Sequence, residues 1–471
     1  MRKRFTKILA TIGPSSASID KLQLLHEVGV DAFRLNFSHG SHDDHARAIK
    51  AIRKIELDSE TPIAIIADMQ GPKIRCGEFE NGQIELNYGE QIFIEYSKEP
   101  GYEGLIRMPH PELFKALEAG HILKFDDGKL QVTITANDGV RLCARVDTPG
   151  TLKSKKGINV INAVLPMSAM TVKDKIDMRF ALSQNVDFIA LSFVQSAQDV
   201  KEARGIIDDR AGIIVKIEKP SAVDNLAEIL EESDVVMVAR GDLGVELPLE
   251  QVPIVQRRII KEARDQGKPV IVATHMLESM IDAPAPTRAE ASDVATAIFQ
   301  GADVVMLSAE TAVGQYPDTA VATMDRIIKA AESDPNYWSA FSLGVLVSAS
   351  TAEDAISFSA KSIAQTMNCA AVFGITQTGS TVKRISRQRP PCPVIGLTPL
   401  INIARRMVLY WGVVPFVTSD PKSFDEMVAS LQSVATSKLE FPKGSSVLIT
   451  AGIPFGRPGT TNTLKVAVLG E

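Results

Sequence analysis

A lysine and a glutamate stand two positions apart in the run IIVKIEKP, near the middle of the chain. Lys216 and Glu218 belong to a β-branched stretch typical of a strand, in which residues two apart point to the same face. Asp242 follows the next such stretch, in the Gly-containing run MVARGDLGVE. Mg²⁺ commonly takes one or two carboxylates and fills its other positions with substrate oxygens and water. The three residues therefore predict a magnesium site beside a lysine.

The same spacing also fits a structural ion pair between Lys216 and Glu218. A lone charged residue at the end of a strand is more often a cap or a solvated charge than part of a site. A group of positively and negatively charged residues that converge at one end of the strands favours a functional site. The polar residues that end the predicted strands and form this set are Arg34, Asn36, Asp68, Lys216, Glu218, Arg240, Asp242, Thr274 and Glu310.

Eight short β-branched runs must position these side chains, and segments with helical periodicity separate most of them. A strand followed by a helix, repeated, predicts a parallel sheet, and eight strands are what a closed (β/α)₈ TIM barrel needs. An open, doubly wound sheet would look similar locally. In a barrel, reactive groups lie at the carboxyl ends of the strands. The runs span residues 7–12, 31–36, 63–68, 187–193, 213–218, 234–240, 269–274 and 303–308.

Two regions depart from this repeat. Between the third and fourth runs, residues alternate between apolar and polar, and Asp127-Gly128 and Asp138-Gly139 are turn signals. We interpret this region as a small β-barrel-like domain inserted in a barrel loop, which could act as a lid. A Ser- and Ala-rich linker at 339–351 precedes a C-terminal α/β domain. The predicted boundaries are 1–71 and 167–338 for the barrel, 72–166 for the insertion and 339–471 for the C-terminal domain.

Composition excludes several classes of protein. The chain has 471 residues, 45% apolar and 23% charged, so it is long enough for two or three domains. A net charge of −6 argues against a nucleic-acid partner, and no stretch is apolar enough to span a membrane. Four scattered cysteines favour free thiols in a reducing, cytoplasmic location. Neither a GxGxxG fingerprint nor a GxxxxGK[ST] phosphate loop is present.

Five motifs carry a resemblance to a known family. FRLNFSHG, MVARGDLGVE, ATHMLESM, PTRAEASDVA and MLSAETAVGQYP resemble those of pyruvate kinases and occur in that family's order. The resemblance extends over nearly the whole chain. It implies transfer of the phosphoryl group of phosphoenolpyruvate to ADP, giving pyruvate and ATP, with Mg²⁺ as cofactor. It also implies a homotetramer.

The resemblance assigns roles to the residues of the predicted magnesium site. It implies that Glu218 and Asp242 hold Mg²⁺, and that Lys216 stabilises the phosphoryl group in flight and the enolate left behind. Such a role suits a cation held ready where negative charge develops. Gly241, Asp242 and Thr274 match substrate-binding positions, with Thr274 near the enolate carbon that must be protonated.

Other positions match the two ends of the substrate site. Arg34 corresponds to a contact with the substrate phosphate, which suits a planar, permanently charged donor. For His39, the alternative interpretation is a loop histidine that binds no ligand. His42 and His45 are spaced so that they could be mistaken for metal ligands, but we favour their placement in a solvated first turn of a helix. The residues that match the nucleotide side are Asn36, Ser38, His39, Arg75 and Lys156, with Lys155 adjacent to the last.

One departure from the family concerns potassium. In K⁺-dependent members, the residues matching Asn36, Ser38, Asp68 and the Met69 carbonyl hold K⁺, and a Glu follows shortly after. Here that Glu is replaced by Lys73 in the run MQGPKIR. An ammonium group could supply the missing positive charge and would repel a bound monovalent cation. We therefore predict activity without K⁺.

A possible regulatory site lies in the C-terminal domain. The run TQTGST opens a predicted helix, and hydroxyls, a glycine and free amides at a helix start form an anion site. A capped turn between strand and helix explains the same residues. The family places a sugar phosphate or a nucleotide such as AMP here, which implies an allosteric phosphate site. Its predicted residues are Thr376, Thr378, Gly379, Ser380 and Thr381.

Two other functions fit parts of this pattern. A Mg²⁺-dependent lyase or aldolase that handles pyruvate enolate also uses a barrel, but the insertion and the nucleotide-side residues disfavour it. A catalytically silent, ligand-binding regulator would show damage at Lys216, Glu218, Asp242 or Thr274, and all four are intact.

Overall fold

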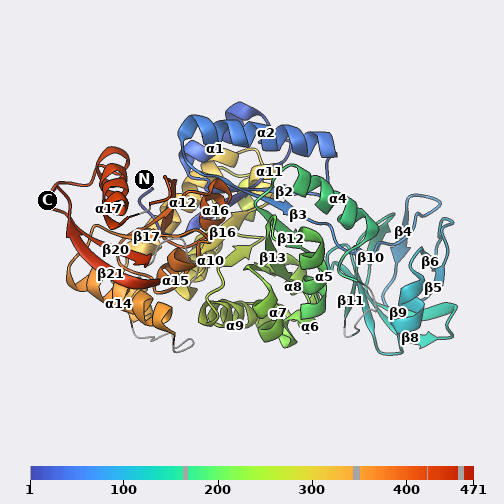
Figure 1. Ribbon diagram of the computed structural model, residues 1–471. Coiled ribbons are helices and arrows are strands. Elements are labelled where there is room, and N and C mark those ends of the chain that lie inside the picture. Colours follow the sequence, from blue (N-terminus) through green and yellow to red (C-terminus); the bar gives the residue numbers. More distant parts are fainter. Residues whose placement is uncertain are drawn as a thin grey trace.

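Eight parallel strands close into a barrel at the centre of the computed structural model (Figure 1). The structure describes residues 2–161, 163, 168–342, 351–421, 423–453 and 461–470. The barrel confirms the predicted fold class. Its strands are buried on both faces, which explains why their sequences are continuous apolar runs rather than alternating ones. They are β1 (Lys7–Thr11), β2 (Ala32–Asn36), β3 (Ala64–Asp68), β12 (Phe188–Leu191), β13 (Gly212–Ile217), β14 (Val235–Ala239), β15 (Val270–Ala273) and β16 (Val304–Leu307).

Helices surround the barrel, and several begin at a capping box that the sequence contains. Ser41, Thr171 and Thr287 each accept a hydrogen bond from the backbone three residues ahead, where an acidic side chain bonds back. The helices of this region are α1 (Ile19–Val28), α2 (His42–Ser59), α4 (Val172–Ser183), α5 (Ala197–Ile207), α6 (Pro220–Asp224), α7 (Leu226–Glu232), α8 (Arg240–Glu246), η1 (Leu249–Gln251), α9 (Val252–Asp265), η2 (Glu278–Ile281), α10 (Arg288–Gln300), α11 (Ala309–Ala312) and α12 (Pro317–Ser333).

The region between β3 and α4 projects from the barrel as a separate β structure with its own core (Figure 1). A six-stranded sheet has the order β11-β7-β8-β9-β5-β6, and β10 pairs with β4. We call this region the lid. The predicted boundary at residue 166 lies outside the described residues. The elements are β4 (Gln83–Leu86), β5 (Gln91–Tyr96), β6 (Leu105–Met108), α3 (Pro111–Ala116), β7 (Ile122–Phe125), β8 (Leu130–Asn137), β9 (Arg141–Thr148), β10 (Gly150–Lys153) and β11 (Ile158–Ile161).

The C-terminal region is an α/β structure with the sheet order β19-β18-β17-β20-β21. Its last strand runs antiparallel to the others. The predicted linker at 339–351 begins within α13, so its start is wrong, and residues 343–350 lie outside the described chain. The elements are α13 (Pro335–Ser342), α14 (Ala352–Thr366), β17 (Ala371–Ile375), α15 (Ser380–Arg387), β18 (Val394–Thr398), α16 (Ile401–Met407), β19 (Val413–Val417), α17 (Phe424–Ser433), η3 (Val434–Lys438), β20 (Ser446–Gly452) and β21 (Thr461–Val468).

The C-terminal region closes the floor of the barrel, at the amino ends of its strands. Val408 and Leu409, which follow α16, belong to the same buried cluster as the residues that point into the barrel. Next to them, Trp411 stacks on Phe5 with ring centroids 4.6 Å apart. Lys7 at the start of β1 donates a hydrogen bond of 2.6 Å to the Val413 carbonyl. The barrel and the C-terminal region therefore share a continuous core.

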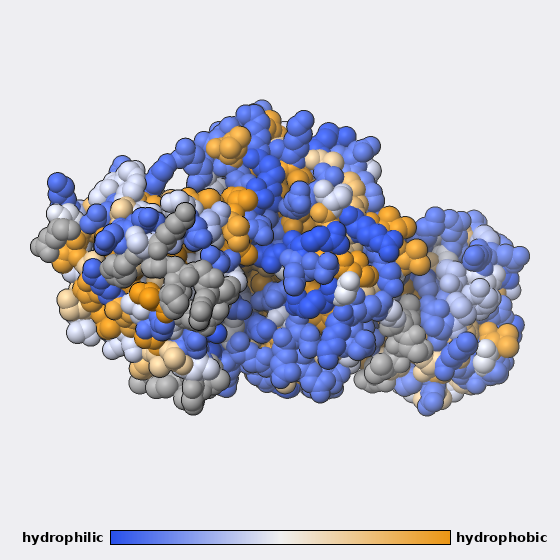
Figure 2. Space-filling model, viewed as in Figure 1, coloured by the Kyte–Doolittle hydropathy of each residue, from blue (hydrophilic) through white to orange (hydrophobic). Residues whose placement is uncertain are grey.

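The outer surface is mostly hydrophilic over the barrel and the lid in the view of Figure 2. Among the helices of the described chain, none has the length and apolar character needed to cross a membrane.

Candidate functional site

Lys216 is the centre of a group of charged side chains at the mouth of the barrel, where the strands end. Its Nζ lies 2.8 Å from Glu218 Oε1 and 3.6 Å from Asp68 Oδ1. It also donates a hydrogen bond of 2.8 Å to Ser192 Oγ. The ion pair between Lys216 and Glu218 that the sequence allowed is therefore present, but it is one part of a larger group.

Arg34 extends this group from β2. Its Nε donates a hydrogen bond of 2.6 Å to Asp68 Oδ2, and its Nη1 donates one of 3.2 Å to Thr11 Oγ1. Asp68 is almost fully buried, so it carries its charge between two cations. We call Arg34, Asp68, Lys216 and Glu218 the mouth cluster.

The charges of the mouth cluster shift one another's pKa values. Burial alone would lower the pKa of Lys216, but Asp68, Glu218 and Asp242 outweigh burial and raise it above its ordinary value. Burial would raise the pKa of Asp68, but Lys216 and Arg34 outweigh it and lower that pKa. Burial raises the pKa of Glu218 to about 7, and Asp242 adds to this rise while Lys216 opposes it. Lys216 therefore stays positively charged, whereas burial makes the negative charge of Glu218 unfavourable.

Two carboxylate oxygens of the cluster lack a hydrogen-bond donor. Asp68 Oδ1 and Glu218 Oε1 are buried, and neither accepts a hydrogen bond in the described part of the chain, although Lys216 lies near both. Glu218 Oε2, in contrast, accepts the Phe193 backbone N–H at 2.8 Å. A buried carboxylate oxygen without a hydrogen bond is costly unless a cation contacts it, and Lys216 is that cation here. A divalent cation could contact Glu218 Oε1 in the same way.

The protein supplies only part of such a cation's coordination. Within the described ranges, no group of three or more His, Cys, Asp and Glu side chains is arranged to hold a metal. Asp242, in the first turn of α8, is near enough to raise the pKa values of both Lys216 and Glu218. One or two carboxylates, with substrate oxygens and water in the other positions, is the usual pattern for Mg²⁺.

The turn after β15 holds Thr274 in an unusual backbone conformation. Its φ is +66° and that of His275 is +53°, a region uncommon for any residue other than glycine and rarest for a β-branched residue such as threonine. Thr274 Oγ1 accepts the Gly241 N–H at 2.7 Å and donates to the Ala273 carbonyl at 2.6 Å. Strain of this kind accumulates at functional sites. The hydroxyl of Thr274 is thereby fixed beside Gly241, the neighbour of Asp242.

Arg240 and Glu310, which the sequence placed in the convergent set, lie outside the mouth cluster. Arg240 Nη2 donates a hydrogen bond of 2.6 Å to the Thr274 carbonyl, and its Nη1 pairs with Asp293 at 2.6 Å. Glu310 accepts the backbone N–H groups of Leu277 and Ser308. Both residues hold loops in place at the carboxyl ends of β14 and β16.

The residues predicted for the nucleotide side lie in two places. Asn36 Oδ1 accepts the Ser38 N–H at 3.1 Å, and the His39 N–H bonds to the Asn36 carbonyl, so these three form one turn after β2. Arg75 donates to the Lys155 carbonyl at 3.4 Å and Lys156 pairs with Asp126 at 2.7 Å, so these contacts are within the lid.

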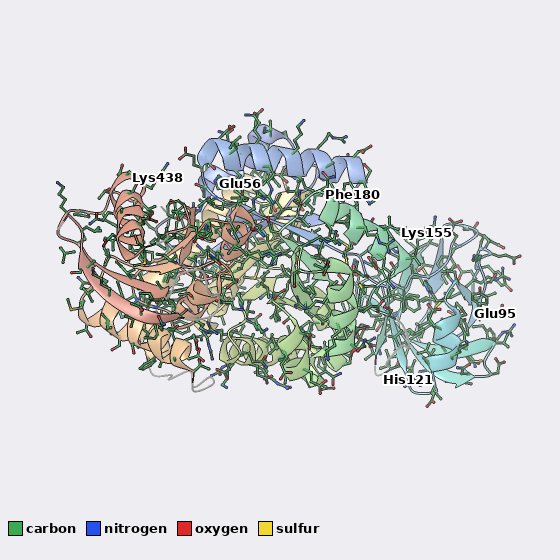
Figure 3. The ribbon with its side chains drawn as sticks, viewed as in Figure 1. Glu56, Glu95, His121, Lys155, Phe180 and Lys438 are labelled. Carbon is green, nitrogen blue, oxygen red and sulfur yellow. The ribbon has the colours of Figure 1, made fainter. Side chains whose placement is uncertain are left out.

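His42 and His45 have structural partners. His42 Nε2 lies 2.8 Å from Asp177 Oδ1, and its ring stacks on Phe180 of α4, labelled in Figure 3, with centroids 4.0 Å apart. His45 is buried, with its ring stacked on Phe37 at 4.1 Å. The prediction of a solvated helical turn is therefore wrong for His45, and neither histidine is arranged as a metal ligand.

The lid contacts the barrel beside Asp242. Lys124 of β7 donates a hydrogen bond of 2.7 Å to the Val245 carbonyl, and Asn159 of β11 donates one of 3.0 Å to Glu246. Between lid and barrel lies a cavity of about 50 Å³, lined by Lys73, Asp242 and others. Asp242 therefore lines a cavity whose other wall is the lid.

Sequence reasoning missed Ser192 and Phe193 as members of the site. Ser192 bridges two segments, because its Oγ accepts from Lys216 and donates to the Met69 carbonyl at 2.8 Å. Phe193 has a φ of +56° and directs its N–H at Glu218. The polar residue at the end of the run 187–193 was a signal for Ser192, but the backbone role of Phe193 had none.

The turn predicted to bind an effector forms internal hydrogen bonds. The Gly379 N–H bonds to Thr376 Oγ1 at 2.9 Å, and Gly379 has a φ of +83°. Thr378 and Ser380 share a hydrogen bond of 3.0 Å between their hydroxyls, and Thr381 makes one of 2.6 Å with Thr461. These contacts fit a capped turn.

Family models match both parts of the chain. A model described as the pyruvate kinase barrel domain matches residues 3–321, and one described as the pyruvate kinase alpha/beta domain matches residues 354–467.

Relatives match over nearly the full length. A pyruvate kinase of Methylorubrum extorquens is 45% identical over 99% of this chain and 98% of its own. One of Agrobacterium vitis is 46% identical over 98% of this chain and 96% of its own. The crystal structure of a pyruvate kinase from Cryptosporidium parvum superimposes with a TM-score of 0.94 at 33% identity, covering 99% of this chain and 96% of that one.

Proposed function

The chain belongs to the pyruvate kinase family of phosphotransferases, and from this premise we propose that the mouth cluster transfers the phosphoryl group of phosphoenolpyruvate to ADP. The observation that carries this assignment is the buried ammonium group of Lys216, which lies between the carboxylates of Asp68 and Glu218 at the mouth of the barrel. It keeps a positive charge at the place where the substrate's negative charge would lie.

Glu218 and Asp242 would hold Mg²⁺, which when bound supplies a Lewis acid for the phosphoryl and enolate oxygens. Lys216 contributes a second positive charge. Its ammonium group is fixed by Ser192, Glu218 and Asp68, so no reorganisation is needed when negative charge develops on the substrate. Arg34, held by Asp68, presents its remaining donors to the substrate phosphate.

Gly241 and Thr274 form the side of the site at which the enolate is protonated. The hydrogen bonds from the Gly241 N–H and to the Ala273 carbonyl leave the Thr274 hydroxyl with one orientation. The proposed position of Thr274 beside the enolate carbon rests on the family pattern. Asn36, Ser38, His39, Arg75 and Lys156 are proposed for the nucleotide.

We propose that activity does not require K⁺. Asp68, which would be a ligand of that ion, already lies between Arg34 and Lys216, and the side-chain oxygen of Asn36 is occupied by the Ser38 N–H. Lys73 lines the cavity that Asp242 faces, which brings a further positive charge to this side. Turnover in K⁺ and in tetramethylammonium buffer should be equal, and a many-fold stimulation by K⁺ would defeat the proposal.

An allosteric phosphate site is proposed at Thr376, Thr378, Gly379, Ser380 and Thr381. Fructose bisphosphate, AMP and sugar monophosphates should be titrated against the phosphoenolpyruvate saturation curve. We expect at least one of them to shift it, and the absence of any shift would remove the proposal.

The remaining proposals concern assembly and location. A homotetramer is proposed from the family, and sedimentation velocity would test it. A reducing, cytoplasmic location agrees with the free cysteines Cys76, Cys143, Cys369 and Cys392.

The decisive experiment is a steady-state assay of phosphoenolpyruvate plus ADP, with and without Mg²⁺, on wild type, Lys216→Met and Lys201→Met. Lys201 is a half-exposed cation, so its variant controls for loss of one charge. We expect Mg²⁺-dependent ATP formation in wild type and Lys201→Met, and loss of most turnover in Lys216→Met with an unchanged circular dichroism spectrum. Carbon–carbon cleavage without ATP formation would instead support a lyase or aldolase, and no turnover with retained ligand binding would support a regulator.

A further inference from the structure

A buried glutamate joins the lid to the barrel beside the mouth cluster. Glu246 is the last residue of α8, and its side chain is 3% exposed. Its Oε1 accepts two hydrogen bonds, one of 2.6 Å from Lys219 Nζ and one of 3.0 Å from Asn159 Nδ2. Lys219 follows β13 of the barrel, whereas Asn159 belongs to β11 of the lid. We call Asn159, Lys219 and Glu246 the lid triad, and it is complete only while the lid lies against the barrel.

The barrel side of this contact is the helix that carries Asp242. Asp242 and Glu246 are four residues apart on α8, so they lie on the same side of the helix. Just before Glu246, the Val245 carbonyl accepts a hydrogen bond of 2.7 Å from Lys124 of the lid. Gly128 of the lid also packs here, because a Cβ on it would lie 3.5 Å from Val245 Cγ1. The lid therefore rests on the helix that positions Asp242.

Lys219 extends the contact to Glu218. It follows Glu218 directly in the chain, and its Nζ lies 5.9 Å from the centroid of the Phe193 ring. The backbone N–H of Phe193 donates to Glu218 Oε2 at 2.8 Å. The same ring packs against Gly71, where the chain leaves the barrel for the lid, since a Cβ on Gly71 would lie 2.7 Å from Phe193 Cδ2. Both proposed metal ligands are therefore connected to the position of the lid, Asp242 through α8 and Glu218 through Phe193.

A structural ion pair between Lys219 and Glu246 would need no donor from the lid. Here the lid supplies the second donor, from the half-buried amide of Asn159 in the wall of the cavity that Asp242 lines. Moving the lid away would remove a hydrogen bond from a buried carboxylate, which is costly. The lid triad therefore favours the closed position of the lid, which an ion pair within the barrel would not do.

We propose that Glu246 is a positioning residue for the phosphoryl transfer, and that it acts by holding the lid closed beside Asp242. This inference rests on the proposed function, because it concerns the same site. In this role Glu246 contacts neither substrate nor metal. It fixes α8, and through Lys219 the segment around Glu218, once Asn159 is engaged. A misplacement of about 1 Å can lower a rate by about 10²-fold, so a contact one helical turn from Asp242 can control turnover.

The test reverses the hydrogen bond between lid and barrel in the full-length protein. Asn159→Asp replaces the amide donor by a carboxylate that faces Glu246, and the two like charges repel each other. Adding Glu246→Gln restores a donor and an acceptor in exchanged positions. Lys219 then keeps a negative charge nearby, because it and Asn159 contact the same oxygen in wild type. The matched control is Asn87→Asp, which makes the same change at an exposed lid asparagine whose amide donates to Glu90 at 3.1 Å.

Two measurements are made on each variant: steady-state turnover of phosphoenolpyruvate and ADP with Mg²⁺, and hydrogen–deuterium exchange of the ligand-free protein in α8 and β11. We expect Asn159→Asp to lower kcat by at least about tenfold and to speed exchange in both segments. Its melting temperature should equal that of Asn87→Asp, because lid and barrel have separate cores. The double variant should recover kcat to within about threefold of wild type, together with slow exchange. Asn87→Asp should match wild type in kcat and in exchange.

Exchange in Asn159→Asp equal to that in Asn87→Asp would overturn the proposal, as would equal kcat in these two variants. A fall in kcat that the second substitution does not reverse, or that comes with a lower melting temperature, would reduce the lid triad to a structural role and would also overturn it. In each of these cases wild type still forms ATP, so the proposed function stands. Failure of wild type to form ATP would defeat the proposed function itself, and with it the role of Glu246.

Discussion

The two ends of the barrel both bury carboxylates beside cations, but they treat the carboxylate oxygens differently. At the floor, an aspartate precedes every second strand, accepts a backbone N–H from the neighbouring strand and pairs with an arginine. In these hydrogen bonds the backbone nitrogen lies 2.7 to 2.8 Å from the carboxylate oxygen. The pairs are Asp31 with Arg4, Asp187 with Arg53, Asp234 with Arg204, and Asp303 with Arg389.

At the mouth, by contrast, Asp68 Oδ1 and Glu218 Oε1 have the Lys216 ammonium group beside them and no backbone N–H. The difference shows how to separate structural ion pairs from a reactive site in a barrel. A buried carboxylate bonded to the backbone N–H of a neighbouring strand stabilises the fold, and a carboxylate oxygen that has only a side-chain cation beside it is open to a ligand.

Glu218→Gln should produce the largest effect. The amide keeps the shape of the side chain but removes a proposed metal ligand, so we expect kcat to fall by about 10³-fold, equivalent to about 4 kcal/mol. The melting temperature should change little. A variant that melts many degrees lower, or that retains wild-type kcat, would break the distinction between mouth and floor.

Asp31→Asn should lower the stability of the protein and leave its activity unchanged, the opposite of Glu218→Gln. Arg4 has a fully buried side chain and would keep Asp325 as its remaining carboxylate partner, so we expect a loss of about 3 kcal/mol in unfolding free energy. The folded fraction should retain wild-type kcat. Urea unfolding followed by fluorescence, with kcat measured at a temperature where both proteins are folded, would check this, and an equal loss of activity would count against it.

The pH dependence of stability should sharpen the contrast. Burial would raise the pKa of Asp31, but Arg4, Arg2 and Lys7 outweigh it and lower it from 3.8 to about 2 in the folded protein. Because the folded state holds this proton less tightly, the stabilisation is complete above about pH 4 and is lost as the pH falls through 2. The difference in unfolding free energy between wild type and Asp31→Asn should shrink by about 2 kcal/mol over this window. A difference that is constant with pH would show that Asp31 is not stabilised as a charge.

The smallest effect is expected for an ion pair at neither end. Lys54 and Asp58 lie 2.8 Å apart on α2, with exposures of 62% and 60%. Lys54→Ala should cost less than about 0.5 kcal/mol in unfolding free energy and leave kcat unchanged. A loss comparable to that of Asp31→Asn would mean that burial does not decide the value of these pairs.

Much of this arrangement could be predicted from sequence. The eight barrel strands were visible because continuous β-branched runs ended in polar residues, and Lys216 and Glu218 were paired by their spacing within a strand. Asp68 reaches Lys216 because β3, β12 and β13 are neighbours in the barrel. No local sequence pattern indicates which strands are neighbours.

Other features of the site depend on the folded backbone. The positive φ of Thr274 and the N–H of Phe193 are consequences of how the loops close over the barrel, and their residue types give no sign of them. In the C-terminal region, Pro415 interrupts the apolar run of β19, so the local pattern there gives no clear sign of a strand.

The closure of the barrel floor by Val408 and Leu409 has a consequence for biosynthesis. The first barrel strand leaves the ribosome early, but the residues that seal the interior below it are translated only in the last part of the chain. A nascent barrel therefore exposes apolar side chains until that segment is translated. Its folding should depend more on chaperones, and should suffer more from a stop codon before residue 408, than the folding of a barrel whose own strands and loops cover its floor.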